Sequence, residues 1–377
     1  MKKKILTPLR LAVLALFVIF ITYEAYMHQV KGGGPDGAAS IHALCPYGGL
    51  ESLFAVFTAG SMIDKIYAGT FVLFGVTIVL VIVFRRAFCG WICPFGGIQE
   101  FLGRLGKKLM GRQLVMPGKA DRVLRYLKYP VLVLTVLAAL KTATLWMSPY
   151  DPWAAYGHIT EGFAALWSES AVGLILLIIT VVGSFLYDRF FCKYLCPMGG
   201  FLGIVSKVSP FKIKRVESVC ISCDLCTKAC SMNIDVAAAD TITDAECINC
   251  QECVAACPKK GALENRFSFK RIFRVTPVKV GLIVLLIYFG GIGVSALAGW
   301  YTLLPAPITS ETTVANVDEL KGYMTLTEIS TLTGMSLDEV YRRMDIPENV
   351  PSSTPVKELS SVVPGFEFHS ARDKLKD

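Results

Sequence analysis

Long apolar runs separated by polar segments give this chain its main pattern. Five of these runs are long enough to cross a hydrocarbon core, which takes about 20 helical residues. They lie at residues 9–27, 66–84, 129–147, 171–187 and 277–300. The pattern therefore predicts an integral membrane protein of mainly α-helical fold, a polytopic helical bundle.

Composition agrees with this interpretation. Of the 377 residues, 53% are hydrophobic and 18% are charged, whereas soluble domains carry roughly 25% charged residues. These values exclude an ordinary soluble enzyme. The formal net charge is +8, which in a soluble protein would suggest a nucleic-acid partner. In a membrane protein, basic residues instead mark the cytoplasmic side, and we expect a lipid membrane and no nucleic acid.

The distribution of basic residues predicts the orientation. The N-terminus holds four Lys and Arg residues, residues 85–128 hold ten and residues 188–279 hold fourteen. By contrast, residues 25–65 contain two and residues 148–170 contain none. We therefore expect a multi-pass protein of the inner (cytoplasmic) membrane, with its N-terminus and both basic segments in the cytoplasm.

One internal repeat organises the chain. Residues 86–97 match residues 189–200 in the string Arg-x-Phe-Cys-x3-Cys-Pro-x-Gly-Gly, at an offset of 103. The repeat predicts two parallel helix hairpins related by a pseudo-twofold axis. The expected domains are two membrane hairpins, a cytoplasmic ferredoxin-like α+β domain, a fifth transmembrane helix and an extracytoplasmic helical tail, at residues 1–105, 106–210, 211–268, 275–300 and 301–377.

Two runs of four cysteines lie between the fourth and fifth apolar runs. Their spacing, Cys-x2-Cys-x2-Cys-x3-Cys, is that of bacterial ferredoxins with two 4Fe–4S clusters, in which the last cysteine of each run ligates the other cluster. Zinc and disulfides are the alternatives, but zinc sites pair two-cysteine knuckles and cytoplasmic thiols stay reduced. We expect cluster 1 on Cys220, Cys223, Cys226 and Cys257, and cluster 2 on Cys247, Cys250, Cys253 and Cys230.

The repeated strings carry four further cysteines: Cys89, Cys93, Cys192 and Cys196. A spacing of four places both thiols of a pair on one face of a helical turn. The proline and the two glycines that follow then end the helix and turn the chain. Under the pseudo-twofold the two pairs face each other, and a further shared iron–sulfur centre is one interpretation. The other is that each string is a helix end with free thiols that docks a partner or the ferredoxin domain.

These motifs resemble a known family. The four-helix core, the twin Cys-x3-Cys-Pro strings and the two-cluster segment, over about residues 1–265, resemble the NapH-type membrane quinol dehydrogenases. They are also similar to the membrane parts of NosR and CcoG, which are polyferredoxin-like membrane proteins. The resemblance implies electron transfer between the quinone pool, or a cytoplasmic donor, and a redox partner. It implies that the named cysteines carry the clusters.

Residues predicted on the outer side form a weaker candidate site. Cys45 is the one cysteine there, and His42 and His158 lie on the same side in the expected topology. A quinone site or a partner site near the outer mouth is one interpretation of these three residues. The alternative is that Cys45 and the proline after it are a remnant of the repeat and cap a helix.

The tail contains two short helix signals. Capping-box patterns at Thr325–Glu328 and Ser336–Glu339 predict helices over about 326–332 and 337–344. A pair of helices of this kind resembles a DNA-reading hairpin, but the expected location is outside the cytoplasm. We therefore expect a docking module for an outer-face partner.

Taken together, the sequence predicts a membrane-bound iron–sulfur electron-transfer protein with redox partners on both faces. The chain is either the electron-transfer subunit of a quinol dehydrogenase or, alternatively, a redox sensor or a metal reductase that serves the assembly of another enzyme. A simple membrane anchor for a ferredoxin is a third alternative.

Overall fold

The structure, a computed structural model, is mainly helical. It describes residues 2–59, 63, 66–111, 113–142, 145–267, 275–305, 320, 322–356, 359–363, 366 and 368–375. The chain divides into two compact units, which are described separately. The first comprises Met1–Gln29 and Ser40–Leu303, and the second comprises Val30–Ala39 and Leu304–Asp377.

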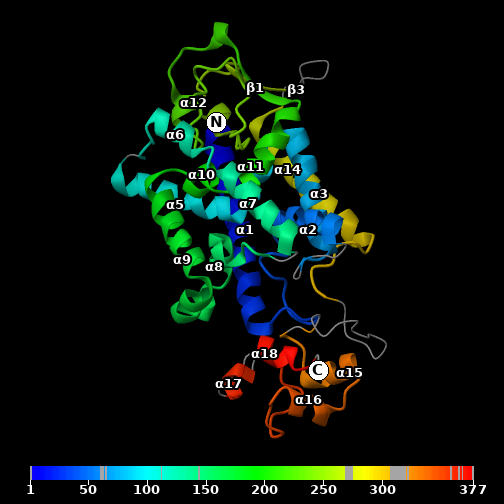
Figure 1. Ribbon diagram of the computed structural model, residues 1–377. Coiled ribbons are helices and arrows are strands. Elements are labelled where there is room, and N and C mark those ends of the chain that lie inside the picture. Colours follow the sequence, from blue (N-terminus) through cyan, green and yellow to red (C-terminus); the bar gives the residue numbers. More distant parts are fainter. Residues whose placement is uncertain are drawn as a thin grey trace. The chain divides into compact units, whose positions relative to one another are not determined.

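Most of the first unit consists of helices that follow one another with short connections (Figure 1). The α-helices are α1 (Lys2–Lys31), α2 (Pro46–Ala59), α3 (Ala68–Phe84), α4 (Ala87–Trp91), α5 (Pro94–Met110), α6 (Gly118–Leu124), α7 (Lys128–Thr142), α8 (Pro152–Gly157), α9 (Phe163–Leu186), α10 (Phe190–Tyr194), α11 (Pro197–Val205), α12 (Leu225–Lys228), α13 (Glu252–Ala256) and α14 (Pro277–Leu297). Single 3-10 turns are η1 (Ser148–Tyr150), η2 (Ile159–Glu161), η3 (Ser206–Val208) and η4 (Glu217–Val219).

Three helical stretches among the described residues are long and apolar enough to cross a membrane: Ile5–Lys31, Gly118–Thr142 and Pro277–Leu297. Two more apolar helices, Ala68–Phe84 and Ser170–Leu186, are shorter. Each of the five predicted spans overlaps one of these helices. The chain is therefore a membrane protein, and the number of its crossings stays a prediction.

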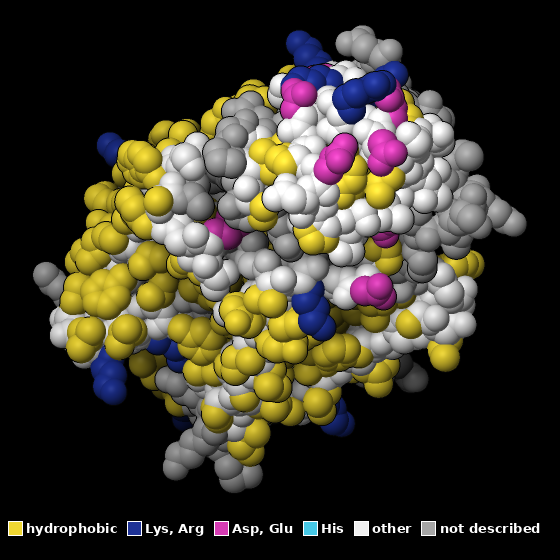
Figure 2. Space-filling view, turned by 90° about the horizontal axis from the view of Figure 1, so that it is seen from below, with side chains coloured by type: hydrophobic (Ala, Val, Ile, Leu, Met, Phe, Trp, Pro, Cys, Tyr) yellow, Lys and Arg dark blue, Asp and Glu magenta, His cyan; other side chains and the backbone are white. Residues whose placement is uncertain are grey.

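The outward surface of the long helices explains why a membrane is needed. Many large hydrophobic side chains are exposed there, and Figure 2 shows broad hydrophobic areas with few charged side chains among them. Exposing so large an apolar surface to water would cost free energy, whereas contact with lipid does not. Examples from α1 and α14 are Leu16, Ile19, Leu282, Leu286 and Leu297.

The repeated strings form the same local structure twice. In each, a five-residue helix (α4 or α10) ends just before the second cysteine, and the next helix (α5 or α11) begins with a proline at its first position. Proline suits this position because the first helical N–H has no intrahelical partner. Cys93 and Cys196 therefore become the N-cap residues of α5 and α11. Helix α5 packs on α9 and α11 packs on α7.

The ferredoxin segment contributes a small antiparallel sheet with strand order β2-β1-β3, formed by β1 (Phe211–Arg215), β2 (Thr241–Ile242) and β3 (Leu263–Phe267). Phe211 of β1 pairs with Phe267 of β3. The ring of Phe84, at the end of α3, lies 5.4 Å from the Phe211 ring and 5.6 Å from the Phe267 ring. The ferredoxin segment thus shares one hydrophobic core with the apolar helices and packs directly against them.

The second unit has its own core. Helices α15 (Leu326–Thr333) and α16 (Leu337–Arg343) form the predicted pair, and their ends lie within one residue of the expected ones. Thr325 and Glu328 form the predicted capping box, and Gly334 ends α15 with a left-handed φ of 70°. The unit also contains α17 (Leu359–Val362) and α18 (Phe368–Asp373). The core of this unit includes Leu326, Ile329 and Leu332 of α15.

Candidate functional site: three cysteine sets

The eight ferredoxin cysteines form two groups around two small cavities. Cys220, Cys223, Cys226 and Cys257 line one cavity. The second cavity is lined by Cys230, Cys247, Cys250 and Cys253. In each group the fourth cysteine comes from the other run, so the chain brings together the sets that the spacing predicts.

Both three-cysteine loops have the same backbone shape. Ser222 and Asp224 of the first loop have positive φ values of 51° and 59°, and Asn249 and Gln251 have values of 49° and 66° at the equivalent positions of the second. Residues other than glycine rarely adopt this conformation. Its recurrence shows that the two loops share one backbone conformation, and the three cysteines of each loop line one cavity.

The two groups differ in exposure. Cys223 of the first group is exposed, whereas Cys247, Cys250 and Cys253 of the second are buried. The pKa of Cys220 is lowered by the backbone N–H of Ser222 and by the Arg215 guanidinium. The first group is thus open to solvent and the second is enclosed by the protein.

A set of four sulfur donors fits an iron–sulfur cluster better than any hard cation, because thiolates are soft ligands. Among the described residues, no group of three or more His, Cys, Asp or Glu side chains has the spacing for a single metal ion.

The third cysteine set lies at the repeated strings. Cys89, Cys93, Cys192 and Cys196 all line one cavity of about 790 Å³, and most of its lining is apolar. The Cys196 sulfur accepts a hydrogen bond from the Gly199 N–H at 3.2 Å. The Cys192 sulfur accepts one from Gln99 Nε2 at 3.1 Å. The two pairs therefore face a common space, as a shared centre requires.

Two buried arginines connect the repeats crosswise. Arg86 of the first string approaches Gly199 of the second, and Arg189 of the second approaches Gly96 of the first. A Cβ on either glycine would lie 2.8 Å from a guanidinium nitrogen, so a larger residue there would force a buried arginine to move. Arg189 also donates to the Cys89 carbonyl oxygen at 2.8 Å. The Nε atoms of both arginines have no hydrogen-bond partner among the described residues.

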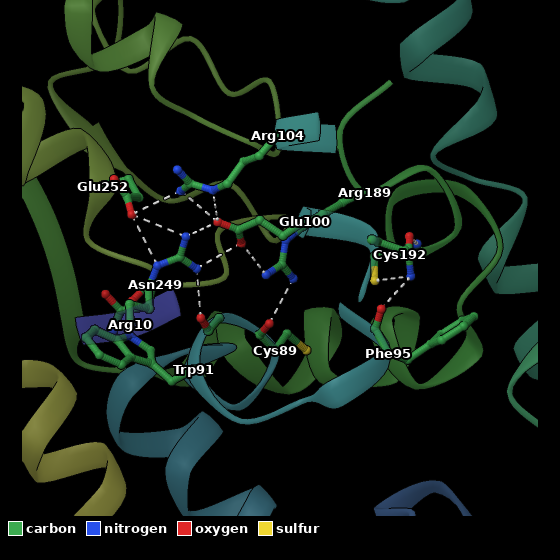
Figure 3. Close-up of polar contacts among 12 residues, drawn as sticks. Arg10, Cys89, Trp91, Phe95, Glu100, Arg104, Arg189, Cys192, Asn249 and Glu252 are labelled. Carbon is green, nitrogen blue, oxygen red and sulfur yellow. Dashed lines mark hydrogen bonds and ion pairs between the residues drawn. The ribbon is translucent and has the colours of Figure 1, made fainter. Parts of the chain in front are cut away.

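An ionic network surrounds the first string (Figure 3). Glu100, on α5, accepts hydrogen bonds from Arg10, Arg104 and Arg189. Burial would raise the pKa of Glu100, but the charges of Arg10 and Arg189 outweigh that effect and lower it. Arg10 also contacts Glu252 in the second ferredoxin loop. Glu100 is the carboxylate that Arg10, Arg104 and Arg189 share, so its removal would take away a partner from two fully buried guanidinium groups.

The second ferredoxin group touches the first string directly. A Cβ on Gly90 would collide with the Ile248 carbonyl oxygen and would lie 3.3 Å from the Cys250 backbone nitrogen. The Trp91 indole N–H donates to the Asn249 carbonyl oxygen at 3.2 Å (Figure 3). The residue between Cys89 and Trp91 must therefore be small, because the loop of Cys250 occupies the place of a side chain.

The weaker outer-side candidates are separated by the structure. His42 and Cys45 line the large cavity. His158 is not among the residues that line it, and its Nδ1 lies 2.9 Å from Glu161 Oε1 and 3.0 Å from Gln29 Nε2. Sequence reasoning missed two acidic residues of the lining, Glu51 and Asp151. The only available signal was an acidic residue inside the apolar segment that became α2.

Two family models match the chain. One, described as a 4Fe-4S binding domain, matches twice, over residues 68–113 and 170–215. The other, described as a 4Fe-4S dicluster domain, matches residues 212–265. With the cysteine cavities and the apolar helices, these matches define the class: an iron–sulfur membrane protein of the ferredoxin type.

Curated relatives narrow the class to a family. YccM of Escherichia coli K12, named as a candidate electron transport protein, is 32% identical over 293 residues, which cover 75% of this chain and 80% of YccM. The regulatory protein NosR of Pseudomonas aeruginosa is 32% identical over 149 residues, or 39% of this chain and 20% of NosR. The ferredoxin-type protein NapH of Haemophilus influenzae is 27% identical over 179 residues, or 46% and 58% of the two chains.

No solved structure matches the chain. The relatives and the family models show that it belongs to the NapH- and NosR-type family of ferredoxin-like electron transport proteins. It is thus an iron–sulfur electron-transfer protein.

Proposed function

We propose that this protein carries electrons between its ferredoxin segment and a quinone held in the large cavity of the first unit. The observation that supports this most strongly is the contact of the Cys250 loop with Gly90. That contact joins the second cysteine group to the string that bears Cys89. Backbone contact between two cofactor-bearing segments leaves no solvent gap for an electron to cross.

The first two sites are 4Fe–4S clusters with crossed ligation. One is held by Cys220, Cys223, Cys226 and Cys257, and the other by Cys247, Cys250, Cys253 and Cys230. When bound, such clusters store and release single electrons. The exposed Cys223 gives the first site access to a soluble redox partner, and the buried second site lies against the membrane part.

A shared centre on Cys89, Cys93, Cys192 and Cys196 is the third site. Its support is the common cavity and the two buried arginines, whose positive charges offset those of thiolates. The quinone then occupies the rest of the same cavity, near His42 and Cys45. A volume of about 790 Å³ with apolar walls suits a ring with part of an isoprenoid tail, since ligand cavities usually measure about 300–1,000 Å³.

The basic segments support an orientation in the inner membrane with the ferredoxin segment in the cytoplasm. A redox partner on each face follows from that orientation. An alkaline phosphatase fusion at residue 260 should be inactive, because this enzyme works only outside the cytoplasm. Activity of that fusion would contradict the orientation without affecting the cluster assignment.

The cluster assignment is tested by iron and sulfide analysis of protein purified without oxygen. Two clusters in the ferredoxin segment contribute about eight irons per chain. Cys230→Ser should damage the cluster on Cys247, Cys250 and Cys253, and leave the other one intact in the electron paramagnetic resonance spectrum. Loss of the signal of the first cluster instead would contradict crossed ligation. Zinc in place of iron would contradict the assignment altogether.

Electron transfer through the contact is tested by reducing the protein with a quinol and following the visible absorbance of its clusters. In the wild-type protein, quinol should bleach this absorbance. Gly90→Ala should slow the bleaching at least about tenfold, because a 1 Å displacement can cost a factor of that order or more. Gly75→Ala is the matched control, since no atom lies within 4 Å of a Cβ there. Equal rates in both variants would contradict the route.

A further inference from the structure

The large cavity contains an acidic residue that no motif explains. Glu51 lies on α2 and lines the cavity, although its side chain is only 5% exposed. No described residue makes a hydrogen bond or an ion pair with it. A buried carboxylate without a partner is costly, so its retention in an apolar cavity indicates a ligand or a chemical role.

We infer that Glu51 is the proton acceptor for a quinol bound in this cavity. This inference rests on the proposed quinone site and adds a residue to it. A quinol that becomes a quinone loses two electrons and two protons, so its site needs both an electron acceptor and a base. The four cysteines at the cytoplasmic strings provide the place for the first, and Glu51 provides the second.

The balance of the reaction can be written for this chain. Both O–H bonds of the quinol break, and each proton moves to the Glu51 carboxylate in turn. The two electrons leave one at a time to a one-electron acceptor of the iron–sulfur class at the cysteine set. Glu51 must pass on the first proton before it takes the second. Asp151, which lines the same cavity, is the next carboxylate on the way out.

The surroundings of Glu51 suit this role. Burial raises its pKa to about 8, with a smaller effect from the charge of Asp151. Burial likewise raises the pKa of Asp151 to about 6. A base works best when its pKa lies near the working pH. On quinol oxidation the ionised form is the active one, so the rate should rise with pH up to about 8 and then level off.

Few other ionisable groups face Glu51. Helix α2 packs against α3 and α7. Helix α3 contains no ionisable side chain, and those of α7 are Lys128, Tyr129 and Lys141, near its two ends. From α2 itself and the residue before it, the groups near Glu51 are Tyr47 and Cys45, whose pKa values its charge helps to raise. Arg86 also lines the cavity, but its guanidinium pairs with Glu246, so among the described residues no cation forms an ion pair with Glu51.

The polar groups beside Glu51 are already occupied, which leaves it as the available base. The Tyr47 hydroxyl is hydrogen bonded to Thr135. His42 Nε2 lies 3.0 Å from the Ser148 hydroxyl. Asp151 accepts a hydrogen bond from the Trp153 N–H at 3.0 Å, as the N-cap of α8.

The test uses the full-length protein with its clusters, reconstituted in lipid and free of oxygen. Decylubiquinol and a short-tailed menaquinol serve as probes, and the rate of bleaching is followed from about pH 6 to about pH 9. In Glu51→Gln the rate should fall about 100-fold, which is typical for loss of a general base, and should no longer depend on pH in this range. Glu51→Asp should keep the rising pH profile with a smaller loss of rate.

Three further measurements separate a proton acceptor from a structural residue. Reduction by dithionite should be unchanged in Glu51→Gln, which shows that the clusters are intact. Binding of the oxidised decylubiquinone should change by less than about threefold, since glutamine has the same shape. Glu348→Gln, an exposed position of the second unit, should match the wild type in every assay.

The outcomes distinguish this inference from the proposed function. If Glu51→Gln oxidises both quinols at the wild-type rate with the wild-type pH profile, the proton role is wrong and the quinone site stands. If it loses quinone binding as strongly as it loses rate, Glu51 binds the ligand and does not accept its proton. If the wild-type protein does not react with either quinol although dithionite bleaches it, the proposed quinone function itself is wrong, and the inference with it.

Discussion

The two repeated strings share their sequence pattern but have different neighbours. In the first string, Gly90 and Trp91 receive the ferredoxin loop. In the second, the equivalent positions are Lys193 and Tyr194. The Lys193 ammonium donates to Asn233 Oδ1 at 2.7 Å. Asn233 lies three residues after Cys230, the last cysteine of the first run. The shared residues thus determine the local turn and the position of the thiols, whereas the variable residues determine what docks on each string.

A second difference lies in the helices that follow the two strings, α5 and α11. Glu100, on α5, is the centre of the ionic network around the first string. The equivalent position on α11 is Gly203, where the nearest atoms to a Cβ lie 3.6 Å away. Near the second string, the buried Lys128 instead forms an ion pair with the buried Glu246. The pseudo-symmetry therefore holds for the cysteines and arginines, and the ferredoxin segment breaks it.

The largest expected effect tests the symmetric part of the comparison. If the four string cysteines hold one centre, Cys89→Ser and Cys192→Ser should each remove all of its iron, because a four-thiolate centre needs ligands from both strings. Iron and sulfide analysis and electron paramagnetic resonance would measure this loss. The double variant should lose no more iron than either single variant, and Cys45→Ser should lose none. Additive losses would mean two independent sites.

The next prediction tests the asymmetric network. Glu100→Gln should lower the free energy of unfolding by about 3–5 kcal/mol, since it leaves the buried Arg189 without its carboxylate and Arg10 with Glu252 alone. Thermal or denaturant unfolding in detergent, followed by tryptophan fluorescence, would measure it. Gly203→Ala, at the equivalent position, should change stability by less than about 1 kcal/mol. Equal effects of the two variants would contradict the asymmetry.

A smaller effect is expected at the second string. Lys193→Met removes the hydrogen bond to Asn233, and hydrogen bonds to charged groups contribute about 1.5–3 kcal/mol. The same unfolding assay would measure a loss in that range. Lys207→Met, at an exposed position, controls for the loss of a positive charge. If both variants have wild-type stability, Lys193 does not tie the string to the ferredoxin segment.

The smallest effect concerns the hydroxyl of Tyr194, which donates to Asp121 Oδ1 at 2.7 Å. Tyr194→Phe should cost about 1 kcal/mol, because Asp121 keeps its ion pair with Arg125. Unfolding of the double variant Tyr194→Phe with Asp121→Asn would show the coupling. Strictly additive costs would mean that the hydroxyl contributes nothing through this bond.

The cysteine groups could be predicted from the sequence because their spacing is a direct consequence of cluster geometry. The expected grouping of Cys230 with the second loop is an example, and the structure places it there. The helices could be predicted from the length of the apolar runs. Even the capping box at Thr325 could be read locally, because its residues are adjacent in the chain.

The buried charges could not be predicted. Arg10 and Lys128 counted as basic residues that mark the cytoplasmic side, yet the structure buries both completely. Their partners, Glu100, Glu246 and Glu252, lie 90 or more residues away in sequence. No periodicity or motif connects such pairs, so only the folded chain reveals them. For the same reason, no motif in the sequence connects Glu51 with Asp151, although both line the large cavity.

The contact at Gly90 also constrains the order in which this protein is built. Once the loop of Cys250 is seated on the first string, Cys247, Cys250 and Cys253 are enclosed, and a protein that delivers iron and sulfide cannot reach them. Cys223 stays exposed in the finished fold. On the proposed assignment, cluster insertion at the buried group would precede docking, whereas a cluster on the group that includes Cys223 would stay open to loading, oxidation and replacement in the mature protein.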